Sequence, residues 1–360
     1  MTSRRGFLRL ALGGISALAL AGCGQASGQV PGSAAATTPS SSARATKVTL
    51  GYFPNVTHAP ALVGVAQDLF AKALPAVTLD YKTFNAGPAL VEALFAGAID
   101  AGYVGPSPAI NGYVQSKGQA LRIVSGAMSG GASLVVRPAA GIKSAQDLSG
   151  KKIASPQLGN TQDVALRFYL QQNGLKSRDK GGTVDVVPTD NPNIVNLFRQ
   201  RQIDGAWVPE PWASTLVLQA GGDVLVDERT LWPAGRFTTV CIVASTNLLK
   251  AQPEIVRGIL SANLTAVSLI GGDRQQAERL AGAQITRVTS QPMPADVLDR
   301  AFANQDATYD PLVSTIRAGA DHAFALGLLG SAKPDIAGLF ELGPLNDVLG
   351  NAAMARVSDT

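Results

Sequence analysis

An internal repeat constrains this chain more than any other feature of its sequence. Residues 89–104 (ALVEALFAGAIDAGYV) recur as residues 193–208 (NIVNLFRQRQIDGAWV), 104 positions later and without a gap. Both copies carry an apolar stretch with helical spacing, then Ile-Asp, two small residues, an aromatic residue and Val. Chance similarity of two amphipathic helices is the alternative explanation. The shared Ile-Asp and aromatic-Val steps favour two lobes built on one plan.

Short apolar runs alternate with helical stretches around each copy. We expect strands at residues 48–53, 77–81, 101–104, 152–154, 184–187 and 205–208. We expect helices between them at residues 59–74, 89–97, 161–173 and 194–201. This order predicts an α/β fold in which each lobe has a mainly parallel sheet covered on both faces. Further helices are expected at 253–280 and 295–328, with a break at Gly271–Gly272, and a final turn and helix at 339–349.

Two more strand-like runs, residues 133–137 and 238–244, stand between the lobes. If both cross from lobe to lobe, they form a two-stranded hinge, with crossovers at 134–135 and 237–244. The first lobe then comprises residues 47–133 plus 245–350, and the second lobe comprises residues 136–236.

The N-terminus predicts export. Arg4 and Arg5 precede an uncharged stretch over residues 10–22, whose 13 residues are too few to span a membrane. Residues 1–22 therefore look like a signal peptide of twin-arginine type. Leu20-Ala21-Gly22-Cys23 resembles the lipobox of bacterial lipoproteins, which implies cleavage before Cys23 and acylation of its thiol. An N-terminal membrane anchor without lipid is the alternative. Residues 23–46 are rich in Ser, Ala, Thr, Gly and Pro, which indicates a flexible tether.

Charge and composition exclude several classes of protein. The chain has 30 basic and 26 acidic residues, and three of the basic ones lie in the predicted signal peptide, so the mature chain is nearly neutral. Nucleic-acid binding thereby loses its main support. Only 2 His and 2 Cys are present, which argues against a His/Cys metal site and a disulfide scaffold. We expect no metal and no cofactor. Cys241 lies in an apolar run and is expected in the core.

The loops after the predicted strands carry the candidate ligand-binding residues, because ligands of parallel α/β sheets bind beyond the carboxyl ends of the strands. These loops and the residue before the first crossover supply Asn55, Thr57, His58, Asn85, Ser107, Gly131, Asn160, Thr161, Gln162 and Asn191. Free backbone N–H groups at helix starts favour a small anion. Each polar residue taken alone could instead simply cap its helix.

Several candidates have two possible roles. His58 could donate to an anion or satisfy a loop carbonyl. Glu210, between two prolines, could bind a cationic part of a ligand or latch the lobes. Trp212 could form a wall of the cleft, whereas Trp207 is expected in the core. His322 is expected at the surface or in packing.

No catalytic motif is evident. The sequence lacks Gly-x-Ser-x-Gly, a Walker loop, His-Glu-x-x-His and Cys-x-x-Cys. Asp100 and Asp204 occupy the same position in the two repeats, at the ends of predicted helices, which favours structural capping over acid–base catalysis. The residues therefore favour a binding protein over an enzyme.

Four segments carry a family resemblance. Residues 51–60 (GYFPNVTHAP), 147–153 (DLSGKKI), 159–165 (GNTQDVA) and 207–212 (WVPEPW) resemble nitrate/sulfonate/taurine-type binding proteins of ABC transporters, and the similarity covers about residues 47–350. The resemblance implies a type II periplasmic-binding-protein fold. It also implies a protein on the extracytoplasmic face of the membrane that delivers a small anionic solute to a permease and its ATPase.

The resemblance leaves the solute open. An aliphatic sulfonate is the first choice, with taurine and nitrate close behind. Taurine-binding members place an acid to meet the amine, a part that Glu210 could play. No Arg lies in the predicted cleft loops, so neutral donors and helix ends would have to hold the anion. We expect a monomer.

The sequence leaves three alternatives open. The same transport role could serve a thiamine-pyrimidine-like heterocycle, for which Phe53, Tyr103 and Trp212 would be the stacking residues. The chain could be a ligand-sensing partner of a membrane receptor. It could also be a thiamine-pyrimidine biosynthetic enzyme, although such relatives use a Cys-rich motif and a His, and here Cys241 stands alone.

Overall fold

The computed structural model describes residues 46–358, which belong to one compact unit. The predicted signal peptide (1–22), the lipidation site Cys23 and nearly all of the tether lie outside the described residues. Thr46, predicted as the last tether residue, instead opens β1 (Thr46–Tyr52) because its backbone pairs with Val77.

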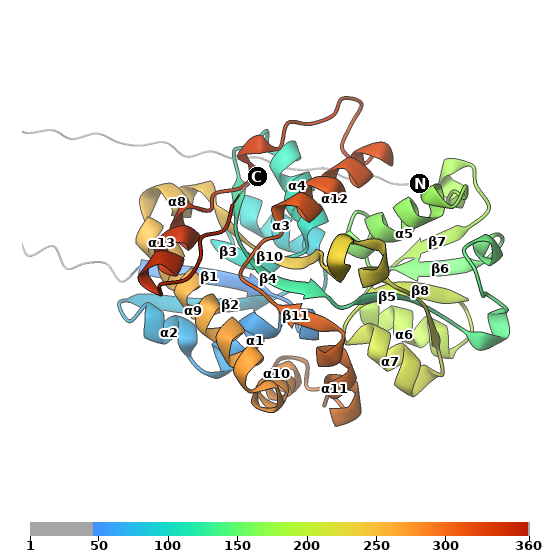
Figure 1. Ribbon diagram of the computed structural model, residues 1–360, viewed down its shortest axis with the longest axis horizontal. Helices are drawn as coiled ribbons and strands as arrows, with labels where there is room; N and C mark the ends of the chain where they lie inside the picture. The colour runs from blue at the N-terminus through green and yellow to red at the C-terminus, as the bar shows by residue number, and fades with distance from the viewer. Residues whose placement is uncertain (1–45, 359–360) are drawn as a thin grey trace, which may run out of the picture. The chain divides into compact units, whose positions relative to one another are not determined.

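The first lobe contains a six-stranded sheet in the order β11-β4-β10-β3-β1-β2 (Figure 1). Its strands are β1, β2 (Val77–Thr83), β3 (Ala101–Val104), β4 (Leu121–Gly130), β10 (Thr238–Ser245) and β11 (Gln305–Ala307). β1 pairs in parallel with β2 and β3, whereas β10 is antiparallel to both β3 and β4.

Helices cover both faces of this sheet. One face packs against α1 (Ala59–Ala66), α2 (Leu69–Ala73), α8 (Thr246–Ala251), α9 (Pro253–Gly272), α10 (Arg274–Thr289), α11 (Ala295–Ala303) and α13 (Gly343–Asn351). The other packs against α3 (Gly87–Phe95), α4 (Pro106–Gln115) and α12 (Val313–Ala325). In β10, Ile242 faces the first of these cores, whereas Cys241 and Val243 face the second, because successive side chains of a strand point to opposite faces of the sheet. Both faces of the strand are therefore apolar and need covering helices. Cys241 is buried, as expected.

The second lobe contains a five-stranded sheet in the order β7-β6-β8-β5-β9. Its strands are β5 (Ala132–Val136), β6 (Lys152–Ser155), β7 (Asp185–Pro188), β8 (Gly205–Pro209) and β9 (Asp223–Asp227). α5 (Thr161–Gln172) covers one face, and α6 (Asn191–Arg199) with α7 (Trp212–Ala220) covers the other. Trp207 lies fully buried in the core beneath α5, which confirms its predicted core position.

The sequence repeat has a structural counterpart. The Asp100 carboxylate accepts from the backbone N–H of Thr49 in β1 at 2.8 Å, and the Asp204 carboxylate accepts from the backbone N–H of Lys152 in β6 at 2.9 Å. The role of both aspartates is structural, as predicted. Each carboxylate, however, binds the backbone of the neighbouring strand instead of capping a helix.

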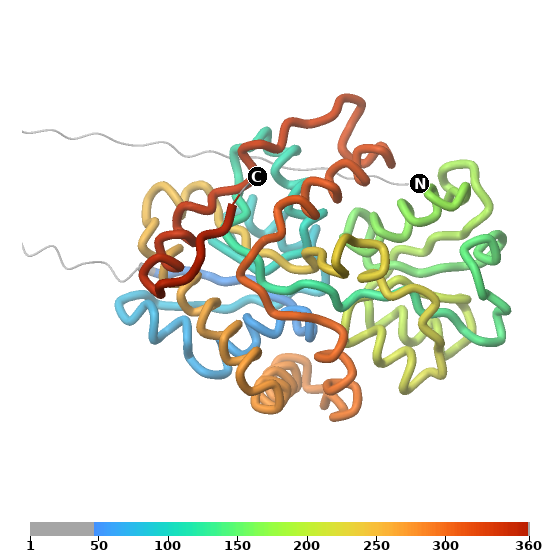
Figure 2. Tube along the Cα trace, in the orientation of Figure 1, coloured from blue at the N-terminus to red at the C-terminus, as the bar shows by residue number. Residues whose placement is uncertain are grey.

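The chain changes sheets at Gly130–Gly131, whose φ angles are 78° and 74°, and returns through residues 228–237 (Figure 2). The predicted crossovers therefore need correction. Leu134 and Val135 lie inside β5 and pair with β8 and β9, and residues 238–244 lie in β10. The change occurs at the glycines because the left-handed backbone conformation there is open to glycine without steric cost.

Among the described residues, α9 is the one helix long and apolar enough to cross a membrane. Its apolar side chains, including Ile259 and Leu260, are buried in the core of the first lobe against α1 and α2. α9 thus packs as a core helix does.

Candidate ligand-binding cleft

The predicted polar residues follow the carboxyl ends of strands in both lobes, and the structure brings several of them together across the lobe boundary. Thr161 begins α5 in the second lobe, and its Oγ1 accepts from the backbone N–H of Ser107 in α4 of the first lobe at 3.4 Å. A Cβ on Gly105 would clash with the same Oγ1. Gly105 therefore permits the close approach of these two helix starts.

Asn160 and Gln162 flank Thr161 and are also buried. The Oδ1 of Asn160 accepts from the Thr161 backbone N–H at 3.1 Å, so Asn160 acts as the N-cap of α5. The capping role is therefore present in the structure. Asn160 also lies at the lobe boundary, where a Cβ on Gly87 of α3 would come to 3.2 Å from Asn160 Oδ1.

A second set of contacts joins the lobes near α7. The Trp212 indole N–H donates to Oδ1 of Asn55 at 3.0 Å. The backbone N–H of Thr57 donates to the carbonyl of Glu210 at 3.4 Å. The carbonyl of Gly131 accepts from the Glu210 backbone N–H at 2.8 Å. The segment around Glu210 is therefore held from both the first lobe and the crossover.

The Glu210 side chain is fully engaged with protein donors. Its carboxylate accepts from the Ser214 backbone N–H and hydroxyl, both at 3.0 Å, and from the Asn304 side-chain amide at 2.7 Å. Burial raises the pKa of Glu210, against the opposing effect of these donors. Of the two roles that the sequence left open, these contacts favour the latch, because Asn304 follows α11 of the first lobe.

A groove of about 440 Å³ opens between the lobes beside these contacts. Asn55, Asn85, Asn191 and Trp212 line it, so four of the predicted residues share one space. Its apolar lining includes Phe84, Pro192, Val195, Ile285 and Met293. Oδ1 of Asn191 is buried and has no hydrogen-bond partner, which leaves an acceptor for a ligand.

His58 adopts an arrangement that neither prediction described. Its Nδ1 accepts from the backbone N–H of Phe53 at 3.4 Å, and the two rings stack with centroids 4.3 Å apart. Burial lowers the pKa of His58 to about 3, so the ring is neutral at physiological pH. His58 therefore supplies no positive charge to an anion.

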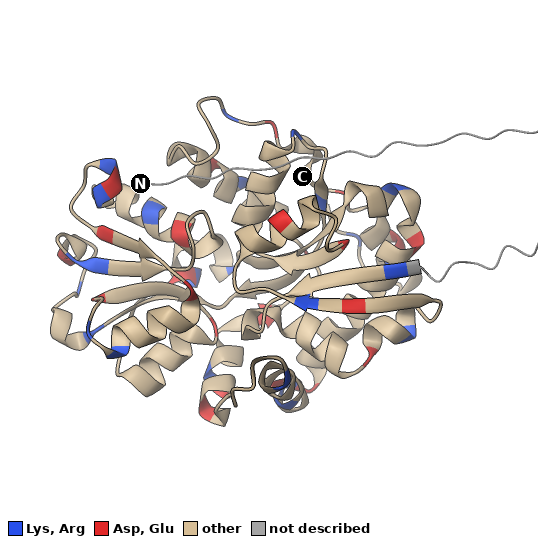
Figure 3. Ribbon diagram, turned by 180° about the vertical axis from the view of Figure 1, so that it is seen from behind, with Lys and Arg blue, Asp and Glu red and all other residues tan. Residues whose placement is uncertain are grey.

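Helix starts at the cleft differ in the backbone N–H donors that they offer. α3, α4 and α6 each begin with a proline in the first turn, which removes a backbone donor, whereas the first turn of α5 keeps all of its N–H groups. Arg199, at the rim of the groove, is exposed and donates to Gln219. Elsewhere acidic and basic residues are interspersed over both lobes (Figure 3).

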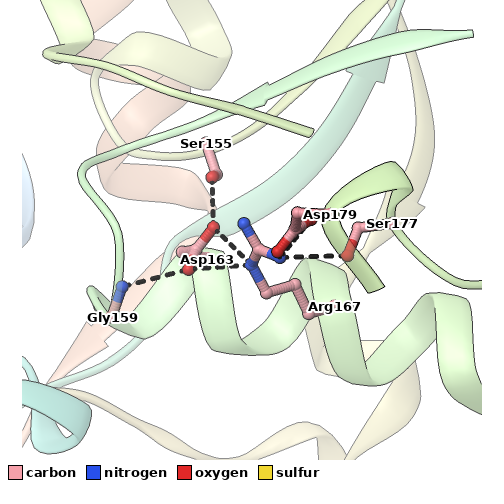
Figure 4. A network of polar contacts seen from close by, with 6 residues as sticks. All are labelled: Ser155, Gly159, Asp163, Arg167, Ser177 and Asp179. Carbon is pink, nitrogen blue, oxygen red and sulfur yellow. Dashed lines mark hydrogen bonds and ion pairs between the residues drawn. The ribbon is translucent and has the colours of Figure 1, made fainter. Parts of the chain in front are cut away.

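The start of α5 is held in place by residues that were not among the predicted site residues. The buried Asp163 accepts from the Ser155 hydroxyl at 2.8 Å, the Gly159 backbone N–H at 3.0 Å and Arg167 Nε at 3.0 Å (Figure 4). Arg167 in turn donates to Asp179 at 3.1 Å. The four-residue spacing of Asp163 and Arg167 in the expected helix was the signal that could have found this pair.

Other expectations are settled by position. Tyr103 is buried in the first lobe, where its hydroxyl donates to Asn263 at 3.1 Å, so it does not line the cleft. His322 packs against Phe168 with ring centroids 3.6 Å apart. Within residues 46–358 no group of three or more His, Cys, Asp or Glu is placed to hold a metal ion.

Comparison with known proteins identifies the family of the chain. Residues 41–286 match the NMT1-like family over more than half of the chain. The chain belongs to the NMT1-like family. The taurine-binding periplasmic protein of Escherichia coli is 29% identical to this NMT1-like chain over 225 residues, which cover 62% of the chain and 66% of that protein, just under two thirds of its length.

Solved structures share the fold of this NMT1-like chain. The alkanesulfonate-binding protein SsuA from Xanthomonas axonopodis, bound to MOPS, has a TM-score of 0.71 and 22% identity and covers 83% of this chain and 99% of its own. The nitrate-binding protein NrtA from Synechocystis has a TM-score of 0.72 and 16% identity, and the match covers 86% of this chain and 89% of NrtA. The prediction of a type II periplasmic-binding-protein fold is confirmed, as is the resemblance to nitrate-, sulfonate- and taurine-binding proteins.

Proposed function

We propose that this chain is the extracytoplasmic solute-binding protein of an ABC importer, and that it carries a small organic anion to a permease and its ATPase. The observation that carries the proposal is the meeting of two helix starts across the lobe boundary, with Thr161 of α5 against Ser107 of α4. Backbone N–H groups at such positions stabilise negative charge without a cationic side chain. The names of the relatives, which bind taurine, alkanesulfonate and nitrate, support the same class of solute.

An aliphatic sulfonate is the solute we favour, with taurine and nitrate next. The sulfonate oxygens would lie near the start of α5, within reach of Asn160, Thr161, Gln162 and Ser107. The carbon chain would enter the groove lined by Val195 and Met293, whose apolar surface nitrate cannot fill. Glu210, already bonded to Ser214 and Asn304, would hold α7 in place rather than meet an amine.

Closure of the lobes would retain the solute. The Trp212–Asn55 and Thr161–Ser107 hydrogen bonds join different lobes, so they form only when the lobes are closed. The chain at Gly130–Gly131 and at residues 228–237 would act as the hinge. The permease would then recognise the closed arrangement, as in hinge-bending transport proteins.

We further propose that export and acylation at Cys23 anchor a monomeric, non-catalytic protein to the extracytoplasmic membrane face. The support is the sequence of residues 1–23 and the chemistry of the remaining thiol. Burial raises the pKa of Cys241 to about 12, which leaves no thiolate for nucleophilic chemistry at neutral pH.

One observation favours a second solute. The unpartnered Oδ1 of Asn191 calls for a hydrogen-bond donor, which an aminopyrimidine such as a thiamine precursor offers and a plain alkanesulfonate lacks. Such a heterocycle would use the same groove and the same transport role.

Thermal unfolding against a panel of solutes tests the proposal. The panel holds an alkanesulfonate, taurine, nitrate, bicarbonate and a thiamine-pyrimidine precursor. A solute at 100 times its dissociation constant should add about 2.7 kcal/mol to the stability, which raises the melting temperature by a few degrees. Thr161→Ala should reduce the shift, and Thr265→Ala, at an exposed position on α9, should keep it in full. A panel without any shift would refute the organic-anion proposal.

A further inference from the structure

A second cavity, of about 400 Å³, lies where α5 and β8 of the second lobe meet the return crossover and α12 of the first lobe. Five rings and one carboxylate line it, those of Phe168, Tyr169, Trp207, Trp232, His322 and Glu228. None of the residues proposed for the solute cleft is among them. The cavity is therefore a separate space with its own chemistry.

Glu228 is the charged group of this cavity. It is 2% exposed. Its two carboxylate oxygens accept from the indole N–H of Trp207 at 2.7 Å and of Trp232 at 3.4 Å. In the part of the chain that the structure describes, no lysine, arginine or histidine forms an ion pair with Glu228, and the neighbouring Asp227 adds a further negative charge. A buried carboxylate in this setting lacks the partner that such groups require.

The rings around Glu228 lie in two groups that contact one another within each group. His322 stacks on Phe168 with centroids 3.6 Å apart and lies 5.6 Å from the ring of Trp232. Tyr169 and Trp207 lie 5.4 Å apart at a tilt of 58°. His322 does not neutralise Glu228, because burial lowers the pKa of His322 and keeps the ring uncharged at neutral pH.

We propose that this aromatic-lined cavity is a binding site for a small organic ammonium ion, with Glu228 as its counter-ion. Trp, Tyr and Phe rings attract an ammonium group through their negative faces, and this attraction is stronger at a desolvated site than at an exposed one. The carboxylate supplies the charge that the rings cannot. The site is independent of the solute that the cleft carries.

Titration of the protein with tetramethylammonium chloride tests the site, with sodium chloride at equal ionic strength as the blank. Calorimetry should show saturable binding of one ion. Glu228→Gln should weaken this binding at least tenfold, since it removes the charge and keeps an acceptor for Trp207. Asp321→Asn is the matched control, because Asp321 is exposed, adjacent to His322 and paired with Lys333 at 2.6 Å. Its affinity should equal that of the unmodified protein.

The pH profile gives a readout that a structural role of Glu228 would not produce. Burial raises the pKa of Glu228 to about 7, so its ionised fraction grows between pH 6 and pH 8. The other charged groups nearby, Asp227 with Arg229 and Asp321 with Lys333, are ion-paired. Affinity for tetramethylammonium should therefore rise severalfold over this range.

Three results would overturn the proposal, namely a response equal to that of sodium chloride, equal affinities of Glu228→Gln and Asp321→Asn, or a flat pH profile in the unmodified protein. The flat profile decides the matter even if Glu228→Gln misfolds. Solute binding in the cleft should be the same in Glu228→Gln as in the unmodified protein, which keeps the two proposals separate.

Discussion

The indole N–H of Trp212 donates to Oδ1 of Asn55 at 3.0 Å, which joins α7 of the second lobe to the first-lobe loop after β1. Trp212→Phe keeps most of the ring surface and removes this donor. We expect about fivefold weaker solute binding, corresponding to about 1 kcal/mol for one hydrogen bond. Calorimetric titration with the solute found in the panel measures it. Trp232→Phe, which removes an indole donor outside the cleft, should bind the solute normally, and equal losses in the two variants would contradict the closure role.

Gly105→Ala should impair closure of the lobes while leaving the stability of the fold nearly unchanged. Gly105 has φ −67°, which alanine adopts freely, but an added methyl group would meet Thr161 Oγ1 from the other lobe. We expect a stability change within about 0.5 kcal/mol and at least tenfold weaker solute binding. Gly271→Ala, where a methyl group meets nothing within 4 Å, is the control.

The same pair offers a double-mutant cycle. In a Thr161→Ala background the clash partner is gone, so Gly105→Ala should cost little further affinity. Additive losses would show that Gly105 acts elsewhere than at this contact.

Asp163→Asn should destabilise the second lobe. The substitution takes the negative charge from the buried Arg167, whose other carboxylate partner, Asp179, is about half exposed. Removing one partner of a buried ion pair costs about 3 kcal/mol, and urea denaturation should show it as a lower midpoint. Asp347→Asn breaks the exposed pair with Arg257 at 3.6 Å and should change the midpoint little. A midpoint shift of similar size in both variants would refute the structural role assigned to Asp163.

Stability should depend on pH through His58. Its pKa falls from about 6.5 in the unfolded chain to about 3 in the fold, so the folded state binds fewer protons and loses stability as the pH drops below 6.5. Between pH 7.5 and pH 5.0 the loss is about 2 kcal/mol, and His58→Gln should remove it. Glu228 has a raised pKa, so its contribution to the pH dependence of stability has the opposite sign. This contribution is the same in the unmodified protein and in His58→Gln, so it cancels when their urea midpoints are compared. Equal pH dependence of the two proteins would show that His58 does not titrate as its burial requires.

The strands that short apolar runs predicted are present in the structure. Each of them lies within two residues of its expected range, namely β1, β2, β3, β5, β6, β7, β8 and β10. β4 was missed because Ser125, Gly126 and Ser129 interrupt its pattern, although these small residues suit its close packing, with a Cβ on Gly126 meeting the carbonyl of Asp310. The expected helix over residues 59–74 breaks at Asp68, whose φ of 53° ends one helix and starts another.

The cleft was predictable only in part. Residues after parallel strands are readable because their place follows from the fold, and Asn55, Asn85, Asn191 and Trp212 do line one groove. Their partners are not readable, since Asn304 reaches Glu210 across 94 positions of sequence. The protonation state of His58 depends on burial by distant elements, which no local pattern records.

The chain leaves the first lobe and returns to it at neighbouring positions. The backbone N–H of Gly130 donates to the carbonyl of Phe237 at 3.2 Å, so the two ends of the intervening segment meet. This segment, which forms the second lobe, is continuous in sequence and is inserted into the chain of the first lobe, the host lobe. Recombination at these two positions would exchange half of the solute's surroundings between relatives in a single step, and the host lobe would keep its own half unchanged.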